Sequence, residues 1–153
     1  MKEIQIERKT LKGFKTRTTN QNEMKPETAK IGALWQSFDQ KVAVDYQNGD
    51  RIYGVYYDYE SDANGEFSVL AGFDGAVDAD SNLDEVSIEA GKYLRFDGTA
   101  KTADDAARVQ AIIETWGEIW QYFSAEPEYE RDYKTDFEYY KDPTQIEIYI
   151  SIK

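Results

Sequence analysis

The sequence predicts an α+β fold made of a duplicated β-α-β-β unit, in which an antiparallel sheet carries two helices packed on one face. Apolar residues recur at helical spacing twice, over residues 31–38 and 103–123. Each of these patterns follows an extended segment and precedes two runs rich in β-branched and aromatic residues. Because 153 residues are close to the usual size of one domain, residues 1–153 are expected to form a single domain with halves of about 1–75 and 84–153.

In the first half, residues 4–18 mix β-branched and charged side chains, and predict a strand or a bent strand pair in which Gly13 marks a bulge. A helix follows, because apolar residues at helical spacing form one face. These are Ile31, Leu34, Trp35 and Phe38. The helix is expected to end before the turn at residues 48–50, and residues 51–59 and 67–73 then form a pair of strands.

The second half repeats this order. Residues 85–96 are extended around Gly91, and a long helix is predicted over residues 103–123. Its broad apolar stripe consists of Val109, Ile112, Ile113, Trp116, Ile119, Trp120 and Phe123. Residues 133–140 and 146–152 then form two strands joined by a turn.

An acidic segment, residues 74–85, is predicted to link the two halves. Residues 78–89 match part of a calcium-loop template, but Leu83 stands where the sharp turn of such a loop needs glycine. We therefore predict a solvated linker and no metal site.

The charge balance excludes several classes of function. The chain has 18 Lys and Arg against 30 Asp and Glu, and a net charge of −12. This charge opposes direct binding to nucleic acid or to an anionic membrane surface. The sequence has no histidine and no cysteine, which excludes triads built on either residue and imidazole or thiolate metal sites. An acidic chain with 14% aromatic residues is suited to bind a cation.

The sequence also carries an expectation about location. No apolar signal region follows Met1, and no run approaches the roughly 18 apolar residues of a membrane span. A cytoplasmic location is therefore expected.

The second half resembles a known family through four local motifs. They are the strand segment 86–96 with its Gly91-Lys92-Tyr93 turn, the helix segment 116–123, the strand segment 136–140, and the ending 146–153. Together with the order of elements, these motifs resemble the effector-binding domain of AraC-type regulators, also called the gyrase-inhibitor-like small-molecule-binding domain. Ser151 stands where the family commonly has proline, a change that a terminal strand tolerates.

The resemblance implies a module that binds small, often cationic and aromatic molecules without a cofactor. The chain has no room for a DNA-binding domain beside the duplicated unit, so it is similar to the stand-alone members, some of which are carried on integron cassettes. The resemblance places the family's buried glutamate at Glu138 and its C-terminal strand tyrosine at Tyr149.

Alternation along the last two strands leaves the orientation of Glu138 open. A hairpin that turns around Asp142-Pro143 would place Glu138 opposite Glu147 and Asp136 opposite Tyr149, with all four side chains on one face. The apolar residues of the two strands would then bury the other face, and Glu138 would face water. Only the resemblance turns Glu138 toward a ligand pocket.

The aromatic candidates for the pocket carry the same ambiguity. Trp116 and Trp120 lie at helical spacing, which is typical of a core as well as of a pocket wall. Trp35 occupies the matching place in the first helix. Of the adjacent residues Tyr56 and Tyr57, which must point to opposite faces, Tyr57 is preferred, and Phe96 is a further candidate.

Three functions follow from these residues. The first is a sensor or sequestering protein for a cationic, amphipathic small molecule, with an unidentified protein regulator as a further partner. The second is a small hydrolase with Glu138 as general base and Tyr149 or Tyr57 as hydrogen-bond donor. The third is an acidic inhibitor that imitates the charge of nucleic acid.

Overall fold

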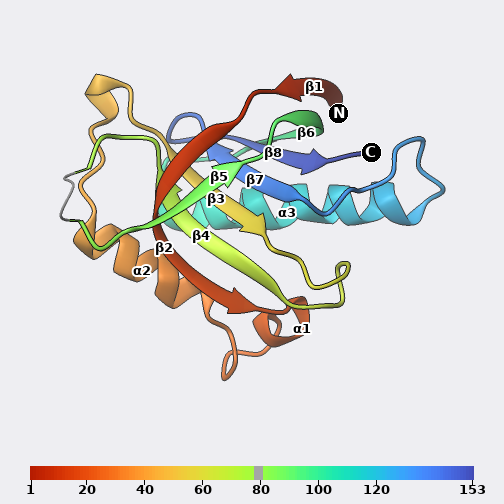
Figure 1. Cartoon of the computed structure of the whole chain (residues 1–153), viewed down its shortest axis with the longest axis horizontal. Coiled ribbons are helices and arrows are strands. Elements are labelled where there is room, and N and C mark those ends of the chain that lie inside the picture. Colours follow the sequence, from red (N-terminus) through yellow and green to blue (C-terminus); the bar gives the residue numbers. More distant parts are fainter. Residues whose placement is uncertain (78–80) are drawn as a thin grey trace.

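One eight-stranded antiparallel sheet forms the frame of the molecule (Figure 1). The computed structural model describes residues 1–77 and 81–153. The strands lie in the order β1-β6-β8-β7-β3-β4-β2-β5 across the sheet. Their bounds are β1 Lys2–Ile6, β2 Lys9–Thr18, β3 Ile52–Tyr57, β4 Phe67–Phe73, β5 Asp84–Ile88, β6 Gly91–Thr99, β7 Thr135–Tyr140 and β8 Gln145–Ser151.

The structure confirms the α+β class and the duplication, and adds one feature to each half. The extended segment at the start of each half consists of two strands. In the first half these are β1 and β2, in line with the bent strand pair that was one of the two alternatives predicted there, and in the second half they are β5 and β6. Gly91, at the start of β6, has a φ of 151°, a backbone conformation that side chains other than glycine's disfavour. The first strand of each half pairs with the other half, since β1 pairs with β6 and β5 with β2.

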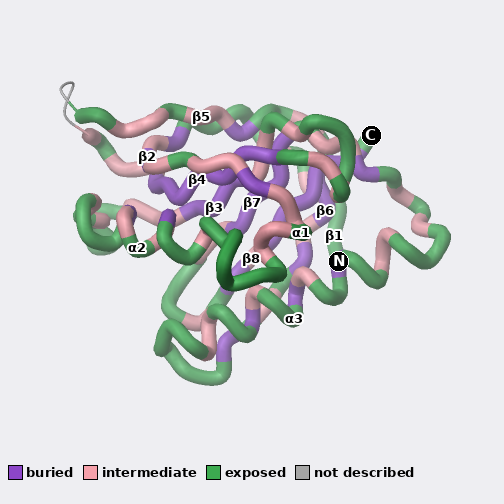
Figure 2. Tube along the Cα trace, turned by 90° about the horizontal axis from the view of Figure 1, so that it is seen from below, coloured by how far each residue is buried: buried purple, intermediate pink, exposed green. Residues whose placement is uncertain are grey.

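Both long helices cover the same face of the sheet (Figure 2). Helix α2 (Ile31–Lys41) packs on β2 and β4, and helix α3 (Asp105–Ser124) packs on β6 and β8. The Asp104 side chain starts α3 by accepting a hydrogen bond from the Ala107 amide at 2.8 Å. Two short helices, α1 (Asn20–Glu23) and η1 (Tyr46–Asn48), flank α2. No helix in the described ranges is long and apolar enough to cross a membrane.

The opposite face of the sheet is buried as well, because the sheet curls on itself. Its buried cluster is rich in aromatic residues and is made of Leu11, Tyr53, Val55, Leu70, Ile88, Tyr93, Phe137 and Tyr149. Every residue of β4 is buried as a result. With both faces covered, alternation of apolar and polar residues cannot indicate which face a side chain occupies.

Two details of the expected chain path are corrected. The register between β2 and β4 runs without interruption through Gly13, so the predicted bulge at this residue is wrong. Gly13 lies opposite Gly72, and a side chain at Gly13 would overlap the carbonyl of Ala71. Of the predicted acidic linker, residues 78–80 lie outside the described residues, and β5 begins within its last residues at Asp84. No group of acidic residues in the described ranges could hold a metal.

We predict that Gly13→Ala lowers the free energy of unfolding by about 1–3 kcal/mol, the usual range for overpacking, or by more. The added methyl group would meet the backbone of β4, which cannot move aside as a flexible side chain could. Urea unfolding measures the effect. Gly32→Ala on α2 is the matched control, because nothing lies within 4 Å of its new Cβ, and we expect it to raise stability by roughly 0.5–1 kcal/mol. Equal effects of the two changes would contradict this account.

Candidate ligand-binding site

Glu138, in the middle of β7, is a buried carboxylate held by three neutral donors. Its side chain is on the helix-covered face, and the residue is 2% exposed. Oε2 accepts hydrogen bonds from the Tyr56 hydroxyl at 2.7 Å and the Trp116 indole N–H at 2.8 Å. Oε1 accepts one from the Tyr140 hydroxyl at 2.7 Å. Residues of β3, β7 and α3 thus donate hydrogen bonds to the same carboxylate.

Space for Glu138 comes from Gly54 on the neighbouring strand. Gly54 lies directly opposite Glu138 in the pairing of β3 with β7. A Cβ at Gly54 would lie 3.0 Å from Oε1 of Glu138 and 3.1 Å from a ring carbon of Trp35 on α2. The absence of a side chain therefore lets the carboxylate and the Trp35 ring approach the sheet.

The carboxylate meets no cation among the described residues. No ion pair there involves Glu138, whereas its neighbour on the same face, Asp136, pairs with Arg131 at 2.6 Å. Burial raises the pKa of Glu138, and the hydrogen bonds from Trp116, Tyr140 and Tyr56 oppose this shift only in part. Burial and the adjacent carboxylate raise the pKa values of Tyr56 and Tyr140 well above 10.0. When ionised, Glu138 is thus a buried negative charge compensated only by neutral donors.

A pocket of about 160 Å³ is lined by two of the three residues that donate to Glu138, although Glu138 itself does not line it. Half of its ten lining residues are aromatic, namely Tyr56, Tyr59, Phe67, Trp116 and Trp120. The ring centroids of Tyr56 and Trp116 are 5.5 Å apart, and those of Trp116 and Trp120 are 6.2 Å apart. Tyr56 and Trp116 therefore join the pocket to Glu138, since each lines the pocket and also donates to the carboxylate.

Two charged side chains, Glu23 and Arg131, line the pocket. Glu23 uses its carboxylate oxygens to accept hydrogen bonds from the amides of Lys30 and Ile31 at the start of α2. Arg131 donates to Asp136, which is fully buried and also accepts from the Tyr59 hydroxyl at 2.5 Å. Glu23 thus belongs to the pocket wall itself, whereas Glu138 is joined to the pocket through Tyr56 and Trp116.

The structure brings four of the predicted site residues together. Trp116 donates to Glu138, and Trp120, which is 42% exposed, forms the outer wall of the pocket. Trp35 lies beside Glu138 on the α2 side, with its ring centroid 5.8 Å from that of Tyr140. Trp116 and Trp120 of α3 thus line the pocket, while Trp116 and Trp35 of α2 lie beside the carboxylate.

The other three predicted residues lie elsewhere. Tyr57 packs in the cluster inside the curled sheet, and Tyr149 stacks on Phe137 there at 4.5 Å. Both are on the face opposite Glu138. Phe96 lies in the core beneath α3, against Tyr122.

The predicted register of β7 with β8 is wrong by one residue. Glu138 lies opposite Ile148, and Glu147 lies opposite Tyr139. The connecting loop is held by Asp142, whose side chain accepts from the amides of Thr144 and Gln145, and it contains one residue more than the assumed turn. A shift of one residue exchanges the faces of a strand, which explains why Glu138 and Tyr149 do not meet.

Several residues of the site were not among the predicted ones, including Tyr56, Tyr59, Tyr140 and Arg131. Tyr140 could have been found, because it is two residues beyond Glu138 on one strand and shares its face. Tyr56 was weighed against Tyr57, and the structure brings Tyr56 to Glu138. Arg131 carried no signal, because it precedes the strand in an irregular acidic segment.

Solved structures with the same fold include two of low sequence identity. One is SAV2435 bound to tetraphenylphosphonium, with 22% identity, a TM-score of 0.65, and coverage of 99% of this chain and 93% of that one. The other is a putative bacterial transcription regulation protein from Staphylococcus aureus MU50, with 22% identity, a TM-score of 0.67, and coverage of 99% and 97%. A search of curated proteins found no match.

A closer likeness joins the chain to integron-borne proteins. The integron cassette protein from the mobile metagenome of Vibrio cholerae is 34% identical, with a TM-score of 0.83 and coverage of 99% of this chain and 95% of that one. The model of the Cass2 family matches residues 4–152. The chain therefore belongs to the Cass2 family of integron-associated effector-binding proteins.

Proposed function

We propose that this protein is a receptor for cationic, amphipathic aromatic molecules, which bind in the pocket of Tyr56, Trp116 and Trp120 with Glu138 as their countercharge. One observation carries the proposal: Glu138 is 2% exposed and has no cationic partner in the described ranges. A buried charge without a partner of opposite sign is costly. A ligand that brings a positive charge beside it would offset that cost.

The aromatic walls suit the same ligand. Each ring face that meets a cation contributes about 0.5–2 kcal/mol, depending on how far water is excluded. The rings of Tyr56 and Trp116 also donate hydrogen bonds to Glu138, so the negative charge lies directly behind the ring layer. A protein of this fold, SAV2435, has been solved with the cation tetraphenylphosphonium, which is consistent with this ligand class.

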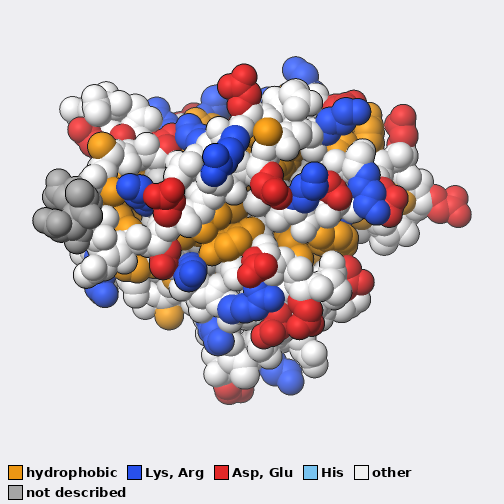
Figure 3. Space-filling view, viewed as in Figure 1, with side chains coloured by type: hydrophobic (Ala, Val, Ile, Leu, Met, Phe, Trp, Pro, Cys, Tyr) orange, Lys and Arg blue, Asp and Glu red, His pale blue; other side chains and the backbone are white. Residues whose placement is uncertain are grey.

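We propose a role as sensor or sequestering protein, without catalysis and in the cytoplasm, with any protein regulator still to be found. The hydrolase alternative required Tyr149 or Tyr57 beside Glu138, and both are on the opposite face. The acidic-inhibitor alternative required one concentrated acidic surface. On the face shown in Figure 3, Lys and Arg side chains are interspersed with Asp and Glu side chains.

Two ions of nearly equal shape and opposite charge test the proposal. In isothermal titration calorimetry, tetraphenylphosphonium is expected to bind saturably, and tetraphenylborate is expected to bind at least about tenfold more weakly, a difference of roughly 1.4 kcal/mol. Equal binding of both ions would leave an apolar pocket with no role for Glu138. Absence of binding by the cation would overturn the proposal.

A further inference from the structure

Arg131 brings an underused donor group to the pocket. A guanidinium has five N–H donors. Nη2 donates to Asp136, while Nε is buried without a hydrogen-bond partner. No hydrogen bond among the described residues uses Nη1. The residue is 8% exposed and lines the pocket. Its Nε donor is therefore withdrawn from water without an acceptor, and its Nη1 donors make no hydrogen bond within the described part of the chain.

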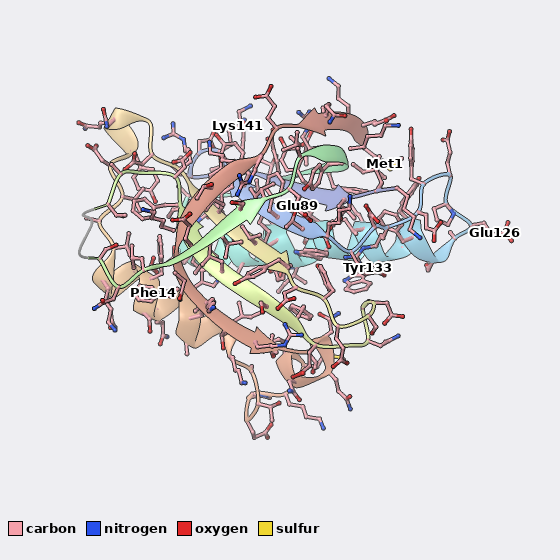
Figure 4. All side chains as sticks on the ribbon, viewed as in Figure 1. Met1, Phe14, Glu89, Glu126, Tyr133 and Lys141 are labelled. Carbon is pink, nitrogen blue, oxygen red and sulfur yellow. The ribbon has the colours of Figure 1, made fainter. Side chains whose placement is uncertain are left out.

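The surroundings hold this guanidinium in place. Its central carbon lies 4.4 Å from the ring centroid of Tyr133, 5.8 Å from that of Trp120 and 5.9 Å from that of Phe123. Tyr133 has a φ of 54°, in the left-handed region that costs a residue other than glycine roughly 1–2 kcal/mol. In Figure 4, Glu126 is at the outer tip of the loop after α3, and Tyr133 lies where this loop returns toward β7. Tyr133, whose ring covers Arg131, thus has an unfavourable backbone conformation.

Besides Glu23, two groups of opposite charge lie at different parts of the pocket. At one end are Tyr56 and Trp116, backed by Glu138. At the other is Arg131, paired with Asp136. Trp120 contacts both ends, because its ring centroid is 6.2 Å from that of Trp116 and 5.8 Å from the guanidinium carbon. A single ligand lying along Trp120 would therefore meet both groups.

We propose that Arg131 determines specificity, by selecting cations that carry a hydrogen-bond acceptor, such as a carbonyl, at the end remote from the positive charge. This inference rests on the proposed function and refines its ligand class. The positive guanidinium repels the ligand's own cation, which therefore lies over Tyr56 and Trp116. An acceptor at the other end would give the guanidinium a partner for Nε, which is otherwise buried without one, and a buried donor is costly to leave unpaired.

A matched pair of probes tests this inference. One is an N-alkylpyridinium with a ketone near the end of its alkyl chain, and the other has a methylene in place of the ketone, each made in several chain lengths. In the wild type, the best ketone is expected to bind about tenfold more tightly than its methylene partner, because hydrogen bonds to charged groups are among the strong ones. Tryptophan fluorescence gives both dissociation constants.

The variants assign this preference to Arg131. Because Arg131→Met alone leaves Asp136 buried without a cation, the double variant R131M/D136N is measured beside it. The asparagine carbonyl can still accept from the Ser151 amide, and its side-chain amide can donate to the Tyr59 hydroxyl oxygen. In both variants the ratio of the two dissociation constants is expected to fall toward one. Arg95→Met, in the partly buried ion pair with Asp97 on β6, is the control and should keep the wild-type ratio.

The outcomes separate the two proposals. Equal binding of ketone and methylene by the wild type, or an unchanged ratio in the double variant, would overturn the role of Arg131 while leaving the cation receptor standing. Failure of the wild type to bind either probe at any chain length would overturn the proposed function and this inference together.

Discussion

Replacing Glu138 with Gln is expected to weaken tetraphenylphosphonium binding by tenfold or more, which corresponds to about 1.4 kcal/mol or more of binding free energy. The change removes the charge and almost nothing of the shape. A glutamine carbonyl at the Oε2 position can still accept from Tyr56 and Trp116, and its amide can donate to the hydroxyl oxygen of Tyr140. The loss of affinity therefore measures the countercharge and is read by calorimetry on a folded protein.

Glu147→Gln is the matched control for this variant. Glu147 is on the adjacent strand β8, opposite Tyr139 and on the other face of the sheet. Its carboxylate also accepts a hydrogen bond from a tyrosine, the hydroxyl of Tyr149, at 2.7 Å. If the long-range charge of the protein governed binding, the two variants would lose equal affinity, and that result would refute the local role of Glu138.

The affinity for the cation is expected to depend on pH and to fall as the pH falls. The folded, free protein holds Glu138 with a pKa above its ordinary value of 4.5, because the side chain is buried. Above this raised pKa the carboxylate is charged and the affinity is constant. As the pH falls through it, the countercharge is protonated, and the affinity is expected to fall by up to about tenfold per pH unit. Calorimetry of tetraphenylphosphonium binding across a pH series measures the profile.

Two variants assign this profile to Glu138. Glu138→Gln should give a flat profile, because the titrating group is gone. Tyr140→Phe removes a hydrogen bond that lowers the pKa of Glu138 and leaves the pocket wall unchanged, so the midpoint of the profile should move to higher pH. A wild-type profile that is flat down to pH 4, or a midpoint that moves the other way, would contradict the account.

The elements of the fold were predictable from local pattern. Both helices follow from apolar residues at helical spacing, and α3 has its N-cap at Asp104, one residue beyond the predicted start. The strand pairs after each helix also lie close to the predicted ranges. The pairing of β1 with β6 and of β5 with β2, each between the two halves, was not predictable. Pairing between segments that are distant in the sequence leaves no local periodicity.

The site was less predictable, for two physical reasons. A sheet with both faces buried makes polar and apolar alternation uninformative, so the pattern alone could not place Glu138. The loop around Asp142 then shifted the register by one residue, which separated Tyr149 from Glu138 and left Ile148 opposite it. The helical tryptophans were predictable because helix spacing does not depend on sheet register.

The pKa of Glu138 itself, with and without a bound cation, tests the central claim most directly. Selective 13C labelling of glutamate carboxyls, with the Glu138 signal identified by its absence in Glu138→Gln, follows this one group by NMR. Because linkage is reciprocal, a cation that binds tenfold more tightly to the ionised form must lower the pKa by one unit. We expect saturation with tetraphenylphosphonium to lower the pKa of Glu138 by about one unit or more. An unchanged pKa in the saturated protein would show that the cation does not bind beside Glu138.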